Sequence, residues 1–408
     1  MLSRLSSTSS AIPLHVPPVI HPSGSMVEGH VAINLRLVHE EDIDEVQVRL
    51  RGVGQTRVDE GDSSSYGKRQ LVRDNLILWT RGSAYPEPGS DVLPVPFSFK
   101  LPAQLPPSFL HRTVSCQAAV RYSVTAVGVR RGILHVNKRQ CVPLTVIPTD
   151  TVGASIKRKN ATHSWRTYSK DERIRRGLWG AYSTVSVQLS LPDILMLPLS
   201  STIPYTITVT TKSPPLTRAQ AAARPLFPPI PDAPDALEFV LRRRMFVRAG
   251  VDTARPTTDA AHFLGAGAQR AASRGGRARP PVSTNVDGGQ WLPAAADARE
   301  KKGRAEEGKG TWVQRAVFES TFSLDVAPSF EIDNFIVCSY ELVVRVPFPG
   351  VGNDLKLEVP VVVTSGIDAP LPRSGATVSG AAHDAPTLDL PPAYWDPEDA
   401  GWRDDEKV

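Results

Sequence analysis

The sequence predicts an all-β protein made of two β-sandwiches in tandem, and three observations support this prediction. Apolar and polar residues alternate with a period of two over many short segments, which is typical of strands with one buried and one wetted face. A block of motifs that begins at residue 97 recurs from residue 322. The 37 prolines and 29 glycines supply the many turns that such a fold needs.

The repeated block consists of four motifs in a fixed order. The first copy occupies 97–101, Pro107-Ser108-Phe109, 121–126 and 142–146, and the second occupies 322–326, Pro328-Ser329-Phe330, 339–344 and 359–363. Tyr122 and Tyr340 hold the same place in the third motif. Copies separated by more than two hundred residues are too distant for a solenoid, so they predict two similar domains.

Before the first copy, alternation predicts strands over 31–37 and 46–50, and a further short strand over 76–79. Residues 1–18 are expected to be disordered. The acidic run at 40–44 is a connection, and the Ser- and Gly-rich segment 59–67 is expected to be a loop. Only 70–78 offers a short helical alternative within 1–150.

In the second half, alternation predicts strands over 185–191, 205–209 and 237–247. Residues 214–234 are rich in proline and are expected to be a loop, because proline cannot donate to a strand ladder. Residues 250–310 are rich in Ala, Gly, Arg and Pro, which predicts a disordered insertion. The chain is expected to re-enter the sheet over 311–326.

The order of these motifs resembles the arrestin family: PPSF and RYSV in the first copy, then APSF, SYELVV and LKLEVPVVV in the second. The resemblance covers roughly 19–150 and 183–365. It implies two arrestin-like (immunoglobulin-like) sandwiches, an N-domain at 19–150 and a C-domain at 181–365. The buried charged core with which visual and β-type arrestins sense receptor phosphates cannot be placed on residues of this sequence.

Composition and cysteine usage indicate the cellular setting. Cys116, Cys141 and Cys338 are odd in number and scattered, with neither metal spacing nor a disulfide framework, which favours buried small residues in a reducing compartment. No apolar run approaches the roughly 20 residues that span a bilayer, and Met1–Ser10 lacks the apolar region of a signal peptide. The expected location is cytoplasmic, peripheral to the plasma membrane or endosomes.

A basic segment at 151–180 would connect the two sandwiches. It carries eight basic residues against Asp171 and Glu172, a net charge of +6 where the whole chain has +5. An anionic membrane surface or acidic cargo is one candidate partner, and a simply solvated linker is the alternative. Nucleic acid is a poor fit, because the charges are not interleaved with aromatic residues on a sheet face. The eight residues are Lys157, Arg158, Lys159, Arg166, Lys170, Arg173, Arg175 and Arg176.

The tail at 366–408 carries a net charge of −6 from Ala381 onward and contains the motif Leu390-Pro391-Pro392-Ala393-Tyr394. Two prolines favour the polyproline II conformation, and Tyr394 follows Pro391 by one turn of that helix, which is how WW domains read PPxY peptides. A spacer without a partner is the alternative. In α-class arrestins such motifs follow the C-domain and recruit WW-domain ubiquitin ligases of the HECT type, which is what the resemblance implies here.

The sequence contains no catalytic set: no phosphate-binding loop, no GxSxG elbow, no metal-binding His pair and no CxxC. The expected function is therefore a non-enzymatic adaptor without cofactors, which links a membrane transporter or receptor to the ligase and promotes ubiquitination and endocytosis. The rival hypothesis is an arrestin-fold scaffold in trafficking or signalling that has no ubiquitin role.

Overall fold

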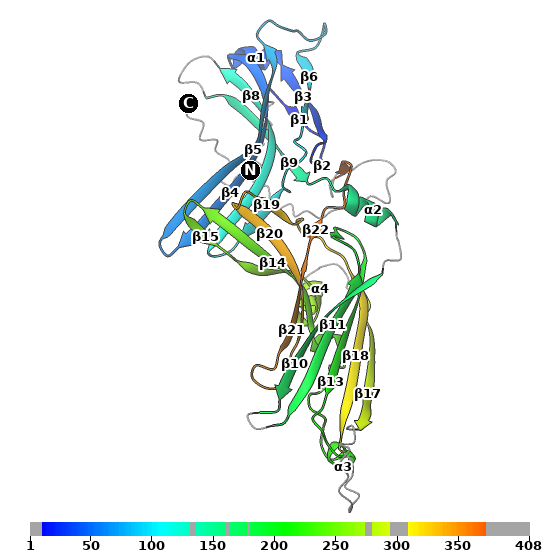
Figure 1. The fold of residues 1–408 in the computed structure, drawn as a ribbon. Helices are drawn as coiled ribbons and strands as arrows, with labels where there is room; N and C mark the ends of the chain where they lie inside the picture. The colour runs from blue at the N-terminus through cyan, green and yellow to red at the C-terminus, as the bar shows by residue number, and fades with distance from the viewer. Residues whose placement is uncertain are drawn as a thin grey trace, which may run out of the picture.

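The computed structural model describes residues 10–130, 136–159, 164–177, 180–273, 280–293 and 309–372. Of the residues that the structure describes, 60% lie in strands and 8% in helices, and most strands pair antiparallel (Figure 1). The predicted all-β fold is confirmed. The tandem arrangement as arrestin-like sandwiches, with its domain boundaries, stays a prediction.

The first part of the chain forms two sheets, one of which β23 from the last described residues joins (Figure 1). One has the order β1-β3-β6, and the other has the order β23-β2-β9-β8-β4-β5 with β7 paired to β8. A short helix, α1 (Leu35–Glu40), follows β3 and is capped by Asn34. The strands are β1 (Leu14–His15), β2 (Val19–Pro22), β3 (Met26–Asn34), β4 (Ile43–Glu60), β5 (Ser63–Thr80), β6 (Val92–Lys100), β7 (Phe109–Arg112), β8 (Cys116–Arg130), β9 (Lys138–Ile147) and β23 (Leu371–Pro372).

The later part forms a sheet of order β10-β11-β13-β18-β17, a sheet of order β15-β14-β20-β19 to which β16 and β21 also pair, and the small pair β12-β22. These strands are β10 (Trp165–Arg175), β11 (Tyr182–Pro192), β12 (Leu197–Pro198), β13 (Ile203–Lys212), β14 (Glu238–Ala249), β15 (Asp252–Ala254), β16 (Thr257–Leu264), β17 (Ser283–Pro293), β18 (Gly310–Phe322), β19 (Phe330–Ile332), β20 (Ile336–Val346), β21 (Leu355–Val361) and β22 (Val363–Thr364). The helices are α2 (Thr151–Lys159), α3 (Arg218–Ala222), the 3-10 turn η1 (Pro234–Ala236) and α4 (Ala266–Ser273).

The alternation of apolar and polar residues in the sequence determines which side chains form the core. Val46, Val48 and Leu50 of β4 are fully buried, whereas their neighbours on the strand stay partly accessible. Tyr122 and Tyr340 are likewise buried on the inner faces of β8 and β20. Burial of such side chains stabilises the fold by about 1.5–3 kcal/mol each.

The two repeat copies make the same set of hydrogen bonds. The Tyr122 hydroxyl donates to the Pro106 carbonyl at 2.8 Å, and the Tyr340 hydroxyl donates to the Ala327 carbonyl at 2.8 Å. The serine two residues after each carbonyl residue accepts a hydrogen bond from the backbone N–H of a residue in a later strand. Those two bonds are Val146 N–H to the Ser108 hydroxyl, 2.9 Å, and Val363 N–H to the Ser329 hydroxyl, 3.0 Å.

The prediction of a disordered insertion at 250–310 is wrong for the residues that the structure describes. β15, β16, α4 and β17 all lie within it, and β16 pairs with β14 while β17 pairs with β18. Phe263 packs against Phe239 and Phe322 with ring centroids 5.1 and 4.6 Å apart. Ladder hydrogen bonds and these few aromatic contacts order a segment whose composition is poor in large apolar residues.

Other sequence predictions also need correction. Residues 10–18 are not a disordered end, because Ile12 and Leu14 are buried and β1 pairs with β3. The segment 59–67 continues the long β4–β5 hairpin instead of forming a loop, and 70–78 is strand. The strand expected over 31–37 ends at Asn34. The segment 151–180 is not a simple linker, because it contains α2 and β10.

The chain after β21 returns to the first pair of sheets. The Ser365 hydroxyl donates to the Pro148 carbonyl at 2.6 Å, and Gly366 N–H donates to the Asp150 carboxylate at 2.9 Å. Ile367 is buried, and β23 then pairs with β2. We call 363–372 the return segment; it places the start of the predicted tail at the edge of the seven-stranded sheet.

Candidate functional site

The structure divides the predicted basic segment between two elements. Lys157, Arg158 and Lys159 lie in α2, and the remaining residues lie in or directly after β10, an edge strand among the described strands of its sheet. The side chain of Lys159 lies outside the described part. The eight charges therefore do not form one patch.

The basic side chains of α2 contact the return segment. The Lys157 ammonium donates to the Ser365 carbonyl at 3.4 Å, and Arg158 forms an ion pair with Asp368 at 3.1 Å. Burial lowers the pKa of Lys157, although Asp150 opposes this shift. These two residues thus help to hold the end of the described chain in place.

The register of β10 places its charges on opposite faces. Arg166 and Lys170 lie opposite Leu191 and Val187 of β11, whereas Arg173 lies on the other face, opposite Thr184. Arg166 forms an ion pair with Asp193 at 3.0 Å, and Lys170 forms one with Glu172 at 2.8 Å.

The outer-face pair is different, because it is held by an aromatic ring. The guanidinium groups of Arg173 and Arg175 lie 4.9 and 5.7 Å from the ring centroid of Tyr182. Arg176 is exposed and lines a cavity of ≈ 320 Å³ together with Phe227, Pro229 and other residues of the neighbouring turns. Arg173, Arg175 and Arg176 are the part of the predicted patch that remains together.

The WW-ligand motif, Leu390, Pro391, Pro392 and Tyr394, lies outside the described residues. The structure bears on it only through the place where the described chain ends, at β23.

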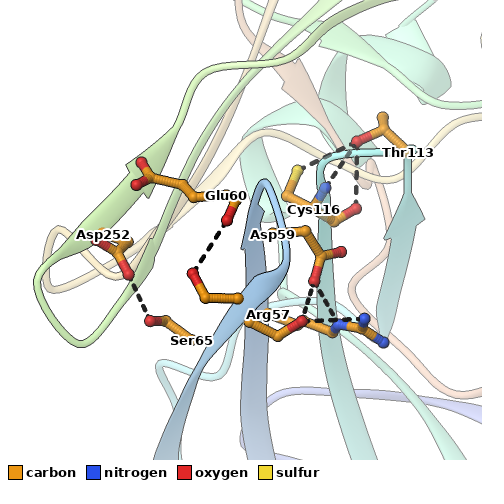
Figure 2. A network of polar contacts seen from close by, with 9 residues as sticks. Arg57, Asp59, Glu60, Ser65, Thr113, Cys116 and Asp252 are labelled. Atoms are coloured by element: carbon orange, nitrogen blue, oxygen red, sulfur yellow. Dashed lines mark hydrogen bonds and ion pairs between the residues drawn. The ribbon is translucent and has the colours of Figure 1, made fainter.

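A second candidate site, which the sequence did not predict, is formed by three turns that meet at the end of the β4–β5 hairpin (Figure 2). Asp59 N–H donates to the Ser115 carbonyl of the β7–β8 turn at 2.8 Å. On the other side, the Ser65 hydroxyl donates to the Asp252 carboxylate of the β14–β15 turn, and the Thr56 hydroxyl donates to the Arg248 carbonyl at 2.6 Å. We call this arrangement the three-turn platform.

Local hydrogen bonds hold two of the three turns of the platform. The Asp59 carboxylate accepts from the Ser64 hydroxyl at 2.5 Å and pairs with Arg57 at 2.8 Å; these two contacts lower the pKa of Asp59. In the β7–β8 turn, the Thr113 hydroxyl accepts from Cys116 N–H at 3.1 Å, as Figure 2 shows. These local contacts stabilise the two turns, and the bonds from Asp59, Ser65 and Thr56 fix the three turns relative to one another.

The platform exposes three large apolar side chains. Val114 of the β7–β8 turn is 100% exposed, Val251 of the β14–β15 turn is 91% exposed, and Tyr66 of β5 is 69% exposed. Exposed apolar groups on neighbouring ordered segments are a candidate contact surface for a protein or a membrane. The signal in the sequence was weak, because a lone Val next to Gly250 or Thr113 looks like any other turn residue.

Beneath the platform, the two repeat copies meet. The Phe109 ring of β7 packs against the Phe330 ring of β19 with centroids 5.0 Å apart. Arg243 lies 5.6 Å from the Phe109 centroid, and its Nε donates to the Tyr340 hydroxyl at 3.2 Å. Arg243 lies mid-strand in β14. Arg243 joins the two copies.

His111 lies at this junction, and its buried position is expected to make the stability of the junction dependent on pH. The ring is buried, stacks 6.4 Å from Phe109, and has its pKa lowered to about 4 by burial and by Arg243. The unfolded chain binds a proton near pH 6.5 that the folded chain binds only near pH 4. We therefore expect stability to be complete above pH 6.5 and to fall between about pH 6.5 and 4.

Between pH 7 and pH 4 the free energy of unfolding should fall by about 1–2 kcal/mol, allowing for screening by solvent. Urea unfolding midpoints measured at pH 7 and pH 4.5 would test this, with His111→Gln expected to flatten the difference. The exposed His15, changed to Gln, is the control. An unchanged pH profile in His111→Gln would show that other groups cause the dependence.

In the part of the chain that the structure describes, no group of three His, Cys, Asp or Glu side chains could hold a metal ion. Within the same residues, no helix is long and apolar enough to cross a bilayer. Neither a protein-family model nor a curated protein matches the chain.

Proposed function

We propose that the chain is an arrestin-like adaptor that links a membrane transporter or receptor to a WW-domain ubiquitin ligase of the HECT type. The ligase would then ubiquitinate the cargo and favour its endocytosis. The observation that carries the proposal is the PPxY motif at Pro391, Pro392 and Tyr394, which follows the second repeat copy. Its position after the last strands is the one that α-class arrestins use, as the resemblance implies.

The cargo side of the proposal rests on the three-turn platform. Its exposed Val114 and Val251 lie on turns, and its exposed Tyr66 lies on β5. Hydrogen bonds fix these elements to one another, so little conformational entropy is lost when a partner binds. The cytoplasmic segment of a membrane protein is the partner that we propose for this surface.

A contribution from the anionic membrane surface belongs to Arg173, Arg175 and Arg176. Each basic residue near such a surface contributes about 1 kcal/mol, so these three residues strengthen membrane binding but are not sufficient for it. Together with cargo contacts they would add avidity, which a single PPxY motif of modest affinity requires.

The change Tyr394→Ala should remove binding to tandem WW domains, because the tyrosine pocket then loses its ligand while the prolines alone bind weakly. We expect an affinity loss of tenfold or more, roughly 1.4 kcal/mol. Pulldown of the full chain by immobilised WW domains is the measurement. Pro386→Ala, a proline in the same tail outside the motif, is the matched control.

Circular dichroism should be the same for both variants. Equal retention of Tyr394→Ala and the unchanged chain would remove the ligase from the proposal. In that case the alternative, an arrestin-fold scaffold without a ubiquitin role, would be favoured by a stable stoichiometric complex that survives loss of the tail.

A further inference from the structure

β5 forms a long edge of the seven-stranded sheet. It spans Ser63–Thr80, and among the strands that the structure describes it pairs only with β4. An edge strand presents a row of backbone N–H and C=O groups with which a further strand can pair. The side chains along such an edge determine which strand it accepts, because unsuitable charges and bulges prevent pairing.

A bulge divides β5 into two halves. Val53 of β4 lies opposite Gln70, and Gly52 lies opposite Val72, so Leu71 is the extra residue. Residues of β5 that lie opposite the outward-pointing residues of β4 share the outer face of the sheet. Because of the bulge, these outer residues have even numbers before Leu71 and odd numbers after it. They are Ser64, Tyr66, Lys68 and Gln70, then Arg73, Asn75 and Ile77.

This arrangement allows β5 to pair with β5 of a second copy about a two-fold axis. An axis perpendicular to the sheet keeps the outer side chains of both copies on one face. When the axis passes through the bulge, Leu71 lies opposite Val72 of the second copy, and the outer residues of one half lie opposite those of the other half. The shared ladder then runs from Tyr66 to Ile77, or roughly 40 Å.

In this register the two copies are complementary. On the inner face, Arg69 lies opposite Asp74 of the second copy, and the symmetry repeats this ion pair. On the outer face, Tyr66 lies opposite Ile77 of the second copy, and these two side chains are 69% and 59% exposed in the single chain. No two like charges are opposed. The remaining polar pairs are Lys68 with Asn75 and Gln70 with Arg73.

The two neighbouring registers are less favourable. A shift of two residues in one direction places Lys68 opposite Arg73, which opposes two like charges. A shift in the other direction places Arg69 opposite Leu76, and both ion pairs are lost. The charges that normally protect an edge strand therefore favour a single register of self-pairing.

The backbone of this edge is already held in place within one chain. Ser65 bonds to Asp252 of the β14–β15 turn, and an added Cβ atom at Gly67 would lie 2.7 Å from the Phe335 ring. These contacts cover the inner face of the first half of β5. A strand that is ordered before it pairs loses little conformational entropy on association.

We propose that two copies of the chain dimerise through their β5 edges, with Leu71 and Val72 at the two-fold axis. The seven-stranded sheets of the two copies then form one continuous antiparallel sheet. Tyr66 also belongs to the three-turn platform, so the two platforms lie near opposite ends of the shared ladder. The further consequence rests on the proposed function: a dimer carries two PPxY motifs, which adds avidity for tandem WW domains.

Disulfide formation between two different variants tests the register. Lys68→Cys chains and Asn75→Cys chains, both with the exposed Cys141 changed to Ser, should form a disulfide-linked dimer when they are mixed and oxidised. Each variant alone should form none. In the dimer, the two copies of position 68, and likewise of position 75, are seven residues out of register, or roughly 23 Å apart.

Charge exchange tests the ion pairs. Arg69→Asp and Asp74→Arg each replace both ion pairs with like charges, so sedimentation should show at least a tenfold rise in the dissociation constant of the dimer for either variant alone. A mixture of the two variants should dimerise again, because every opposed pair then joins an Asp to an Arg. Recovery also shows that both variants are folded. The control, Asp171→Arg on the edge strand β10, should leave the dimer intact.

A full chain that sediments as a monomer at about 100 µM, where a micromolar dimer is nearly complete, overturns the proposal. A dimer in which Lys68→Cys and Asn75→Cys chains form no mixed disulfide overturns it as well, because another surface then joins the copies. So does a mixture of the charge variants that stays monomeric. If the dimer forms as described but WW domains do not bind the chain, the proposed function fails while the dimer stands.

Discussion

Phe109→Ala is expected to lower the free energy of unfolding by about 3–5 kcal/mol. Phe109 is 1% exposed and packs against Phe330 from the other repeat copy, with Arg243 above its ring. Truncation removes both contacts and leaves a cavity where the two copies meet. Chemical denaturation followed by intrinsic fluorescence measures the loss, and Tyr85→Ala, at a 70% exposed position, should change it by less than about 0.5 kcal/mol.

The same site allows a test of coupling between the copies. Phe109→Ala and Phe330→Ala combined should cost less than the sum of the two single changes, with an interaction free energy of about 0.5–3 kcal/mol. Strictly additive costs would mean that the ring contact across the junction contributes nothing of its own.

Gly52→Val is expected to destabilise the first part of the chain by about 1–3 kcal/mol through overpacking. A Cβ atom at Gly52 would lie 2.6 Å from the Tyr122 ring and 2.6 Å from Val72 Cγ1, so the ring would have to move. Movement of the ring would also disturb the hydrogen bond from the Tyr122 hydroxyl to Pro106.

Thermal unfolding of Gly52→Val measures this effect. Gly288→Val is the matched control, because no atom lies within 4 Å of its added Cβ and its backbone does not need glycine. An unchanged midpoint for Gly52→Val would show that the space over Gly52 can be enlarged without cost. The packing argument for the Tyr122 motif would then be wrong.

The strands that carry the repeat could be predicted, because their burial follows the alternation of single residues. Tyr122 and Tyr340 lie on buried faces of β8 and β20, as the period of two indicated. What could not be predicted were contacts between distant segments. The equivalence of the Tyr122 and Tyr340 hydrogen bonds, for instance, depends on carbonyls that the sequence does not relate to them.

The amino-acid composition led to a wrong prediction in a segment whose structure depends on strand pairing. The segment 250–310 has few large apolar residues, but β16 and β17 satisfy their backbone groups against β14 and β18, and composition carries no record of such a ladder. Phe263 and Trp291 were the available signals, each at the centre of an aromatic contact.

Charge clustering misled in a similar way at the basic segment. Eight nearby charges suggested one patch, but strand alternation places Arg166 and Arg173 on opposite faces, and Arg158 pairs with Asp368 of the return segment. The basic residues on the outer face of the seven-stranded sheet escaped notice for the opposite reason. They are spread from Arg49 to Arg139 and are brought together only by strand order.

The return segment determines where the chain can be truncated without damage to the fold. A chain that ends at Thr364 would lose the Ser365 and Gly366 hydrogen bonds, the buried Ile367 and β23. A chain that ends at Gly380 keeps all of these and still lacks the PPxY motif. The second truncation therefore separates loss of the motif from damage to the fold.

Proximity labelling in cells tests the adaptor most directly, with three forms of the chain compared: the full chain, the chain that ends at Gly380, and Val114→Asp with Val251→Asp. We predict that the truncated chain loses WW-domain ligases and keeps membrane transporters or receptors, while the platform variant loses the membrane proteins and keeps the ligases. If all three forms label the same set of proteins, the proposed adaptor function is wrong.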